Sequence, residues 1–216
     1  MSNAFQQATG KLPTFASGSA KWLRLVASGN FFLQQWARER GVDWFSLYDP
    51  TYSLGTVTAT DTYDLDDEIL KLSQQEGDSV RITHGDAHYT DYTIITADRL
   101  KDYPTGYFCA KVGRTLKFNR PFIATDSQFS GTITAPVYVY PETFEDDNDD
   151  IQIDDPNWLV FVTAADFVRN DVTRKDLRAD LVAQANEAMQ SMKEDNEAQL
   201  SEVRMTWSPS DRTDWY

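Results

Sequence analysis

Residues 20–41 read AKWLRLVASGNFFLQQWARERG, and this stretch carries the clearest structural signal in the chain. Its apolar residues recur at helical spacing and would form one face: Trp22, Leu25, Val26, Gly29, Phe32, Leu33 and Trp36. Ser19 can cap the first turn, and Gly41 can end the last one. The pattern predicts a helix over residues 20–40. Residues 1–19 are polar and broken by Gly and Pro, so an extended N-terminal arm is expected there.

The middle of the chain is rich in the β-branched and aromatic residues that strands prefer. Short runs of them are separated by Gly, Asp, Pro and Asn residues, which favour turns. The runs are 56–60, 80–83, 92–97, 107–112, 115–119 and 137–140. They predict a mostly antiparallel sheet over residues 55–142, with a hairpin around Gly113. The aromatic residues 42–50 before it are expected to pack beneath a turn.

The last third of the chain has the pattern of two helices. Asp155 can cap a helix that starts at Pro156, and Thr173 with Asp176 resembles a capping box for the next one. The helices are predicted over residues 156–170 and 173–200, and so short a connection favours an antiparallel hairpin. Residues 145–150 hold five acids in six positions, which repel one another and predict an exposed linker.

Together these elements predict an α+β fold. A helical bundle, made of the N-terminal long helix and the C-terminal helical hairpin, would carry an inserted mostly antiparallel β-domain and extended terminal arms. The helices are expected to share one core, because their apolar faces have no other partner of helical period. The main domain is predicted over residues 20–204, between an arm at 1–19 and a docking tail at 205–216.

Composition limits the classes of function. The 20 Lys and Arg against 34 Asp and Glu leave a net charge of −14, which disfavours a sequence-independent grip on nucleic-acid phosphates. The single cysteine, Cys109, cannot form an intrachain disulfide and suits a reducing compartment. No apolar run has the length of a membrane span and no secretion signal is recognisable, so a soluble protein is expected.

One short segment has the letters of a catalytic motif. Gly77-Asp78-Ser79-Val80 resembles the nucleophile block of serine esterases of the Gly-Asp-Ser type, with His88 close behind. That chemistry requires the serine to end a strand and open a helix, whereas Ser79 is predicted to start a strand. A β-turn is therefore the favoured interpretation.

The two histidines of the chain, His84 and His88, lie near Asp86 and Asp91. Such a group could in principle bind a divalent metal, but no matched third ligand accompanies the histidines, so a solvated loop is favoured. The acidic residues 145–150 lack the alternating pattern of a helix-loop-helix calcium site. We expect no cofactor and no metal, and a chelator should leave the melting temperature unchanged.

Three segments in a particular order carry a family resemblance. DWFSLY at residues 43–48 follows the first helix, TDTYDLDDEILKL at 60–72 follows a strand, and residues 158–193 have the pattern of a closing helical hairpin. This order resembles the head-to-tail adaptor (connector) proteins of tailed bacteriophages, in which an aromatic D/G-W-x-x-L patch follows an amphipathic helix and an acidic turn follows a threonine-rich strand. The resemblance covers about half of the chain, and the extended β-region departs from it.

The resemblance implies a structural protein and not an enzyme. Adaptors of this kind form a ring, commonly of twelve copies, under the portal and around the channel through which the genome leaves the capsid. The expected partners are the portal protein, tail or neck proteins and further copies of the chain, with viral DNA passing through without specific binding and no membrane involved. The protein would be made in the host bacterial cytoplasm and end in the neck of the virion.

The C-terminal segment MTWSPSDRTDWY, residues 205–216, is predicted to bind a partner. Its aromatic residues Trp207, Trp215 and Tyr216 follow the last helix on a segment broken by Pro209, and aromatic rings contribute much of the energy of interfaces. The portal or a neighbouring subunit is the expected partner. A tail folded back on its own sheet is the alternative.

Other functions compete with the adaptor interpretation. A stopper, a tail terminator or a tail-tube protein of a phage would share its ring habit and acidic composition. A binding module outside viruses is a further alternative, and a serine esterase is the least favoured one.

Overall fold

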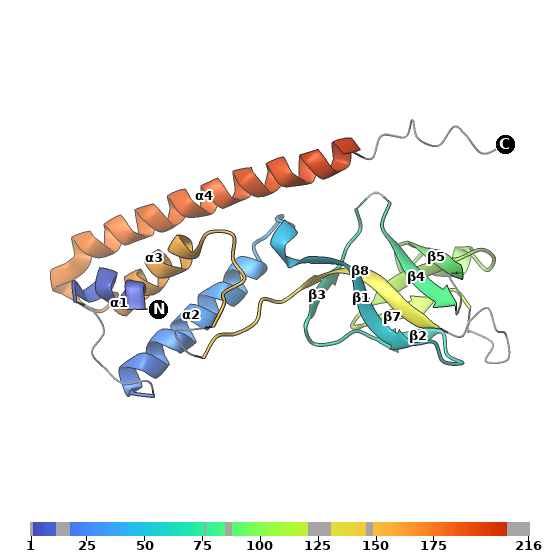
Figure 1. Cartoon of the computed structure of the whole chain (residues 1–216), viewed down its shortest axis with the longest axis horizontal. Helices are drawn as coiled ribbons and strands as arrows, with labels where there is room; N and C mark the ends of the chain where they lie inside the picture. The colour runs from blue at the N-terminus through green and yellow to red at the C-terminus, as the bar shows by residue number, and fades with distance from the viewer. Residues whose placement is uncertain are drawn as a thin grey trace. The chain divides into compact units, whose positions relative to one another are not determined.

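The computed structural model describes residues 2–11, 18–75, 77–84, 88–120, 131–145 and 149–206. The chain divides into two compact units. Unit 1 comprises residues 1–47 and 141–216 and holds the four α-helices, and unit 2 comprises residues 48–140 and holds the sheet (Figure 1).

Unit 1 contains α1 (Ser2–Thr9), α2 (Ala20–Ala37), α3 (Pro156–Phe167) and α4 (Lys175–Thr206), with short 3-10 helices η1 (Phe45–Leu47) and η4 (Val172–Arg174). The predicted caps of α2 and α3 are confirmed. Ser19 Oγ accepts the Trp22 N–H at 3.3 Å, and Asp155 accepts the Asn157 N–H at 2.9 Å. Each bond satisfies a backbone donor that the first helical turn leaves unpaired.

The short helix α3 lies at the centre of unit 1. It is apolar on nearly all sides, and α1, α2 and α4 each pack against it. Its buried side chains are Trp158, Leu159, Thr163, Ala164 and Ala165. A helix that is apolar all round is stable only when other elements cover every side. The surrounding helices therefore depend on α3 as their common partner.

Unit 2 is built from one eight-stranded sheet. The strands are β1 (Tyr48–Thr56), β2 (Thr62–Asp64), β3 (Ile69–Leu72), β4 (Ser79–His84), β5 (His88–Ile94), β6 (Phe108–Val112), β7 (Thr115–Phe118) and β8 (Thr132–Val139), with a 3-10 helix η2 (Leu100–Asp102). Their order is β1-β8-β4-β5-β6-β7-β2. Strand β3 also pairs with β8, at residues 137–139, whereas β4 pairs with β8 at residues 133 and 134. All pairs are antiparallel except β5 with β6, which is parallel.

The sheet curls around its own core (Figure 1). Alternate residues along the strands are buried inside it, including Val80, Ile82 and Ile133, which are fully inaccessible. Aromatic rings fill the wide part of the core, where Tyr92 meets Phe118 edge to face at 4.9 Å between ring centroids. The predicted hairpin around Gly113 is confirmed between β6 and β7.

The predicted fold class is wrong. The chain is a mixed α/β protein with one large curled sheet, and not a helical bundle with an inserted β-domain. Among the described residues α4, with 32 residues, is the only long helix. Helical periodicity identified apolar faces correctly, but it could not reveal that the short helix α3 would cover several of them.

Four local predictions also need correction. Residues 2–9 form α1 and not an extended arm, because Ala4, Phe5 and Ala8 are buried in a cluster with α3. Of residues 42–50, which were expected to pack beneath a turn, 48–50 begin β1, and this strand spans residues 48–56 and not the predicted 56–60. The capping box at Thr173 is absent, because Asp171 is the cap and accepts the Thr173 N–H at 3.0 Å. The helix predicted over residues 20–40 ends at Ala37.

Candidate functional site

The predicted partner-binding residues Trp207, Trp215 and Tyr216 lie outside the described residues. Their role stays a prediction from the sequence.

The segment with the letters of an esterase motif belongs to the sheet. Ser79 is the first residue of β4 and pairs with Thr93 of β5. Asp78 accepts a hydrogen bond from the Tyr48 hydroxyl at 2.9 Å. Burial and the neighbouring Asp78 carboxylate raise the pKa of Tyr48. Ser79 therefore occupies a strand start, in place of the strand-to-helix turn that the esterase chemistry uses.

The two histidines end and begin neighbouring strands. His84 is the last residue of β4 and His88 the first of β5, and the two are backbone partners across the hairpin. Asp86 lies outside the described residues, and Asp91 forms an ion pair with Arg81 at 2.8 Å. Within the described ranges, the His, Cys, Asp and Glu side chains form no group of three or more suited to a metal ion.

Within the segment 43–48 that carries the family resemblance, residues 43–47 have a structural role in unit 1. The Trp44 ring stacks on Trp36 at 4.9 Å between ring centroids, and its Nε1–H donates to the Trp36 carbonyl at 2.8 Å. Asn196 of α4 accepts the Phe45 N–H at 2.7 Å and donates to the Asp43 carbonyl at 3.0 Å. Asn196 is itself buried, so it satisfies two backbone groups of this segment.

The acidic segment 60–72 holds a turn of unit 2 together. The Tyr63 hydroxyl donates to the Thr58 carbonyl at 3.0 Å, and Arg114 donates to the Asp66 carbonyl at 2.7 Å. Arg114 also forms an ion pair with Asp67 at 2.9 Å. Packing and turn geometry therefore account for these residue types in the segment, and no ligand is needed to explain them.

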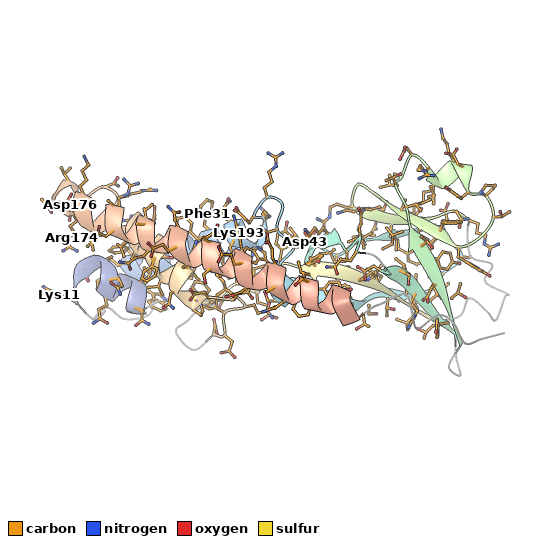
Figure 2. The ribbon with its side chains drawn as sticks, turned by 90° about the horizontal axis from the view of Figure 1, so that it is seen from above. Lys11, Phe31, Asp43, Arg174, Asp176 and Lys193 are labelled. Atoms are coloured by element: carbon orange, nitrogen blue, oxygen red, sulfur yellow. The ribbon has the colours of Figure 1, made fainter. Side chains whose placement is uncertain are left out.

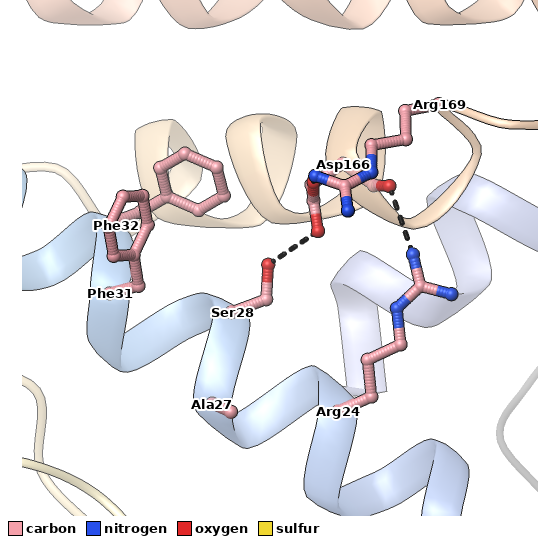
Figure 3. A pocket seen from close by; sticks show the side chains of 7 residues that line it. All are labelled: Arg24, Ala27, Ser28, Phe31, Phe32, Asp166 and Arg169. Atoms are coloured by element: carbon pink, nitrogen blue, oxygen red, sulfur yellow. Dashed lines mark hydrogen bonds and ion pairs between the residues drawn. The ribbon is translucent and has the colours of Figure 1, made fainter.

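A pocket of about 370 Å³ lies between α2 and α3 in unit 1 (Figure 3). We call it the α2–α3 pocket. Its lining comes from two segments that are far apart in the sequence: Arg24, Ala27, Ser28, Phe31 and Phe32 on one side, and Asp166 and Arg169 on the other.

The helical period of α2 brings the first group to the pocket. The helix buries the face that contains Trp22, Leu25, Gly29, Leu33 and Trp36. Residues 24, 27, 28 and 31 follow the i, i+3, i+4, i+7 spacing on a different side of the helix. They are therefore aligned along the axis of α2 and available to the pocket.

Asp166 organises the polar half of the α2–α3 pocket. Ser28 Oγ donates to Asp166 Oδ2 at 2.9 Å, and Arg169 Nη1 pairs with Asp166 Oδ1 at 2.9 Å. The Arg24 guanidinium donates to the Asp166 carbonyl at 3.3 Å (Figure 3). Both carboxylate oxygens are thus engaged, and Ser28 and Arg24 tie α2 to the end of α3.

The α2–α3 pocket is locally cationic in a chain of net charge −14. Two arginines face one aspartate in its lining. Arg24 contacts a neutral carbonyl and lies 5.1 Å from the centre of the Phe167 ring, so none of the contacts described for it neutralises its charge. A carboxylate that enters the pocket would find an arginine without giving up an existing ion pair.

An exposed apolar stripe continues the pocket along α2. Leu23, Ala27 and Phe31 are exposed at i, i+4 and i+8, and we call them the α2 stripe. Leu23 is 58% exposed and Phe31 57% exposed, and the Phe31 ring meets Phe32 edge to face at 5.3 Å. Contiguous exposed apolar patches are typical of surfaces that bind other proteins.

The groups at this site are suited to binding. Ser28 donates its proton to a carboxylate that also accepts from Arg169, and the arginine side chains offer hydrogen-bond donors and no acceptor. The pocket and the α2 stripe together fit a group with an aromatic or aliphatic body and a carboxylate.

Sequence reasoning missed this site, although a signal for it was present. The apolar face of the helix was recognised, but Leu23, Ala27 and Phe31 fall off that face at helical spacing of their own. A second apolar stripe on a helix whose first stripe is already buried indicates a second partner. Asp166 and Arg169 had no such signal, because their place beside α2 is set by tertiary packing.

Comparison with protein-family models and with curated proteins finds no match to this chain. In the part of the chain that the structure describes, none of the helices combines the length and the apolar character that a membrane crossing requires. The function is therefore inferred from the site itself and from the sequence resemblance.

Proposed function

We propose that this chain is a structural protein that assembles with other protein subunits, and specifically the head-to-tail adaptor of a tailed bacteriophage. In this proposal it forms a ring, of twelve copies, under the portal protein in the virion neck after synthesis in the bacterial cytoplasm. The observation that supports assembly most directly is the α2 stripe, in which Leu23 and Phe31 are both more than half exposed beside a cationic pocket.

The stripe supports assembly because its exposure costs free energy in an isolated subunit. Apolar surface is stabilised by about 25 cal/mol for each Å² removed from water. Packing in unit 1 leaves Leu23 and Phe31 exposed, although α2 has a well-buried face on another side of the helix. A partner that covers the stripe would recover that free energy, and the arginines beside it would orient the partner.

The charge of the chain supports the channel role. A channel wall rich in carboxylates repels the phosphates of DNA, so the genome can pass without binding specifically. The net charge of −14 agrees with that requirement. The predicted anchors Trp207, Trp215 and Tyr216 would then supply contacts to the portal or to a neighbouring subunit.

Electron microscopy of negatively stained particles tests the proposal. The purified chain would be imaged alone and after mixing with the portal protein of the same phage. Rings stacked on one face of the portal are expected. Rings or tubes that form without the portal and do not bind to it would instead identify a stopper, terminator or tube protein, and a chain that neither forms rings nor binds the portal would refute an assembly role in the neck.

A deletion tests the predicted anchor residues. A chain that lacks residues 205–216 should melt like the parent and fail to join the portal. A destabilised chain that still assembles would show that the segment folds onto its own subunit.

A further inference from the structure

We propose that the α2–α3 pocket and the α2 stripe bind residues 207–216 of a second copy of this chain, so that subunits join head to tail. This inference rests on the proposed assembly function and names the surface and the partner segment that would carry it. Three observations support it: the chemistry of the pocket, the composition of the segment, and the length of α4 compared with the reach of the segment.

The pocket and the segment are chemically complementary. The pocket offers the exposed ring of Phe31 and the guanidinium of Arg24. The segment WSPSDRTDWY has three aromatic residues, and two aspartates against one arginine. Aromatic rings can pack on Phe31 or under the guanidinium, and a carboxylate can pair with Arg24. A net charge of −1 in the segment meets a net charge of +1 in the pocket lining.

The Arg169 side of the α2–α3 pocket lies at the end of unit 1 where α4 begins, and Phe31 lies farther along the unit (Figure 2). Leu177, in the first turn of α4, belongs to the same apolar cluster as Phe167 and Val168 at the end of α3. The Arg174 guanidinium donates to the Ala8 carbonyl of α1. Figure 2 shows Lys11, Arg174 and Asp176 together at this end of the unit.

The segment follows the other end of α4 and is too short to span that helix again. The residues from Leu177 to Thr206 are helical and rise about 44 Å at 1.5 Å per residue. Trp215 is nine residues beyond Thr206, and nine residues span at most about 32 Å when fully extended. Trp215 therefore does not reach back to the start of α4 within one chain, whereas the pocket of a neighbouring subunit can be within reach.

Binding of this kind creates a heterologous interface, in which two different surfaces of the same chain meet. Such interfaces generate closed rings when the rotation between subunits closes, and open filaments when it does not. Each subunit would use its α2–α3 pocket toward one neighbour and its C-terminal segment toward the other. A ring needs both surfaces on every subunit.

Peptide binding tests the pocket directly. A fluorescein-labelled peptide of residues 205–216 would be titrated with the full chain carrying Trp207→Ala and Trp215→Ala, and its fluorescence anisotropy measured. In this background Phe31→Ala should raise the Kd about tenfold or more, as expected for an aromatic anchor. Arg24→Gln should raise it several-fold. The matched control Arg178→Gln replaces an exposed arginine of α4 and should leave the Kd unchanged.

Complementation tests the head-to-tail arrangement. The tail variant, Trp207→Ala with Trp215→Ala, and the pocket variant, Phe31→Ala with Arg24→Gln, should each stay monomeric in sedimentation velocity. Their mixture contains one intact pocket and one intact segment, so it should form a dimer and no larger species. A mixture that stays monomeric, a tail variant that associates like the parent, or a Kd unaffected by Phe31→Ala would overturn the inference.

These experiments distinguish a failure of the pocket inference from a failure of the adaptor proposal. Portal-bound rings without peptide binding would refute the pocket inference and leave the adaptor function standing. Peptide binding and complementation without portal binding would refute the adaptor function and leave the head-to-tail interface standing.

Discussion

Replacement of Trp36 by alanine tests the core of unit 1. Trp36 is 0% exposed, and its ring stacks on Trp44 with an angle of 27° between the ring planes. The substitution removes a whole indole from a packed site and leaves one face of Trp44 without its neighbour. Truncation of a buried Trp to Ala costs about 3 to 5 kcal/mol. The hydrogen bond from Trp44 to the Trp36 carbonyl remains possible, because it uses the main chain.

Urea unfolding measures this loss. Residues 48–140 contain no tryptophan, so tryptophan fluorescence reports on unit 1 alone. Trp22 and Trp158 keep the signal in the Trp36→Ala variant. For a chain of this size, about 1 kcal/mol corresponds to a shift of about 2 to 4 °C in Tm. The variant should therefore melt roughly 6 to 20 °C below the parent, with a lower urea midpoint.

Two further variants test whether loss of the buried ring causes the destabilisation of Trp36→Ala. Trp36 Nε1 is buried and finds no acceptor among the described residues, so Trp36→Phe removes an unpaired donor while it keeps a stacked ring. It should cost far less than Trp36→Ala. Leu23→Ala, on the exposed side of the same helix, should change stability by no more than about 0.5 kcal/mol. A Trp36→Ala variant with the urea midpoint of the parent would refute the assignment of Trp36 to the core.

The remaining predictions concern single contacts. Asn196→Ala leaves the Phe45 N–H and the Asp43 carbonyl without their buried side-chain partner, so unit 1 should lose about 1 to 3 kcal/mol in the same urea assay, and a loss near zero would contradict the bridge. Burial raises the pKa of Cys109 to about 12, so a disulfide reagent at pH 8 should label the thiol only after denaturant is added; rapid labelling of the native chain would contradict the burial. Burial also raises the pKa of Tyr92 from 10.0 to about 12, and burial with a hydrogen bond to Asp66 does the same for Tyr52. A raised folded-state pKa favours the neutral phenol, so this contribution to stability is complete below pH 10 and is lost as the pH rises toward 12. Urea unfolding followed by far-UV circular dichroism at several pH values measures this decline. Tyr92→Phe should make the decline shallower, and an unchanged pH dependence would contradict this cause.

The features that sequence reasoning predicted correctly depend on neighbours in the chain. Ser19 and Asp155 cap their helices because the bonds span two or three residues and need no distant partner. Gly113 adopts a φ of +64° in the hairpin between β6 and β7, a conformation that glycine enters without steric cost. Such features are fixed by local chemistry.

The features that were missed depend on segments far apart in the chain. β1 contains Pro50 and Gly55, which disfavour strands, but pairing with β8 stabilises it and register shifts accommodate the two residues. The eight residues of α1 are too few for a stable isolated helix, and burial of Phe5 against α3 compensates. The parallel pairing of β5 with β6 is likewise decided by the path of the chain between them.

The candidate site also has one part that the local sequence determines and one part that tertiary packing determines. The sequence by itself determined that α2 has two apolar stripes, since a period of 3.6 residues places Leu23, Ala27 and Phe31 on a side of their own. Only the tertiary structure decided which stripe is buried and that Asp166 comes to Ser28 across 138 residues. The physical reason is that periodicity acts within one helix, whereas burial depends on which other surfaces are free to cover it, and α3 covers one stripe and leaves the other exposed.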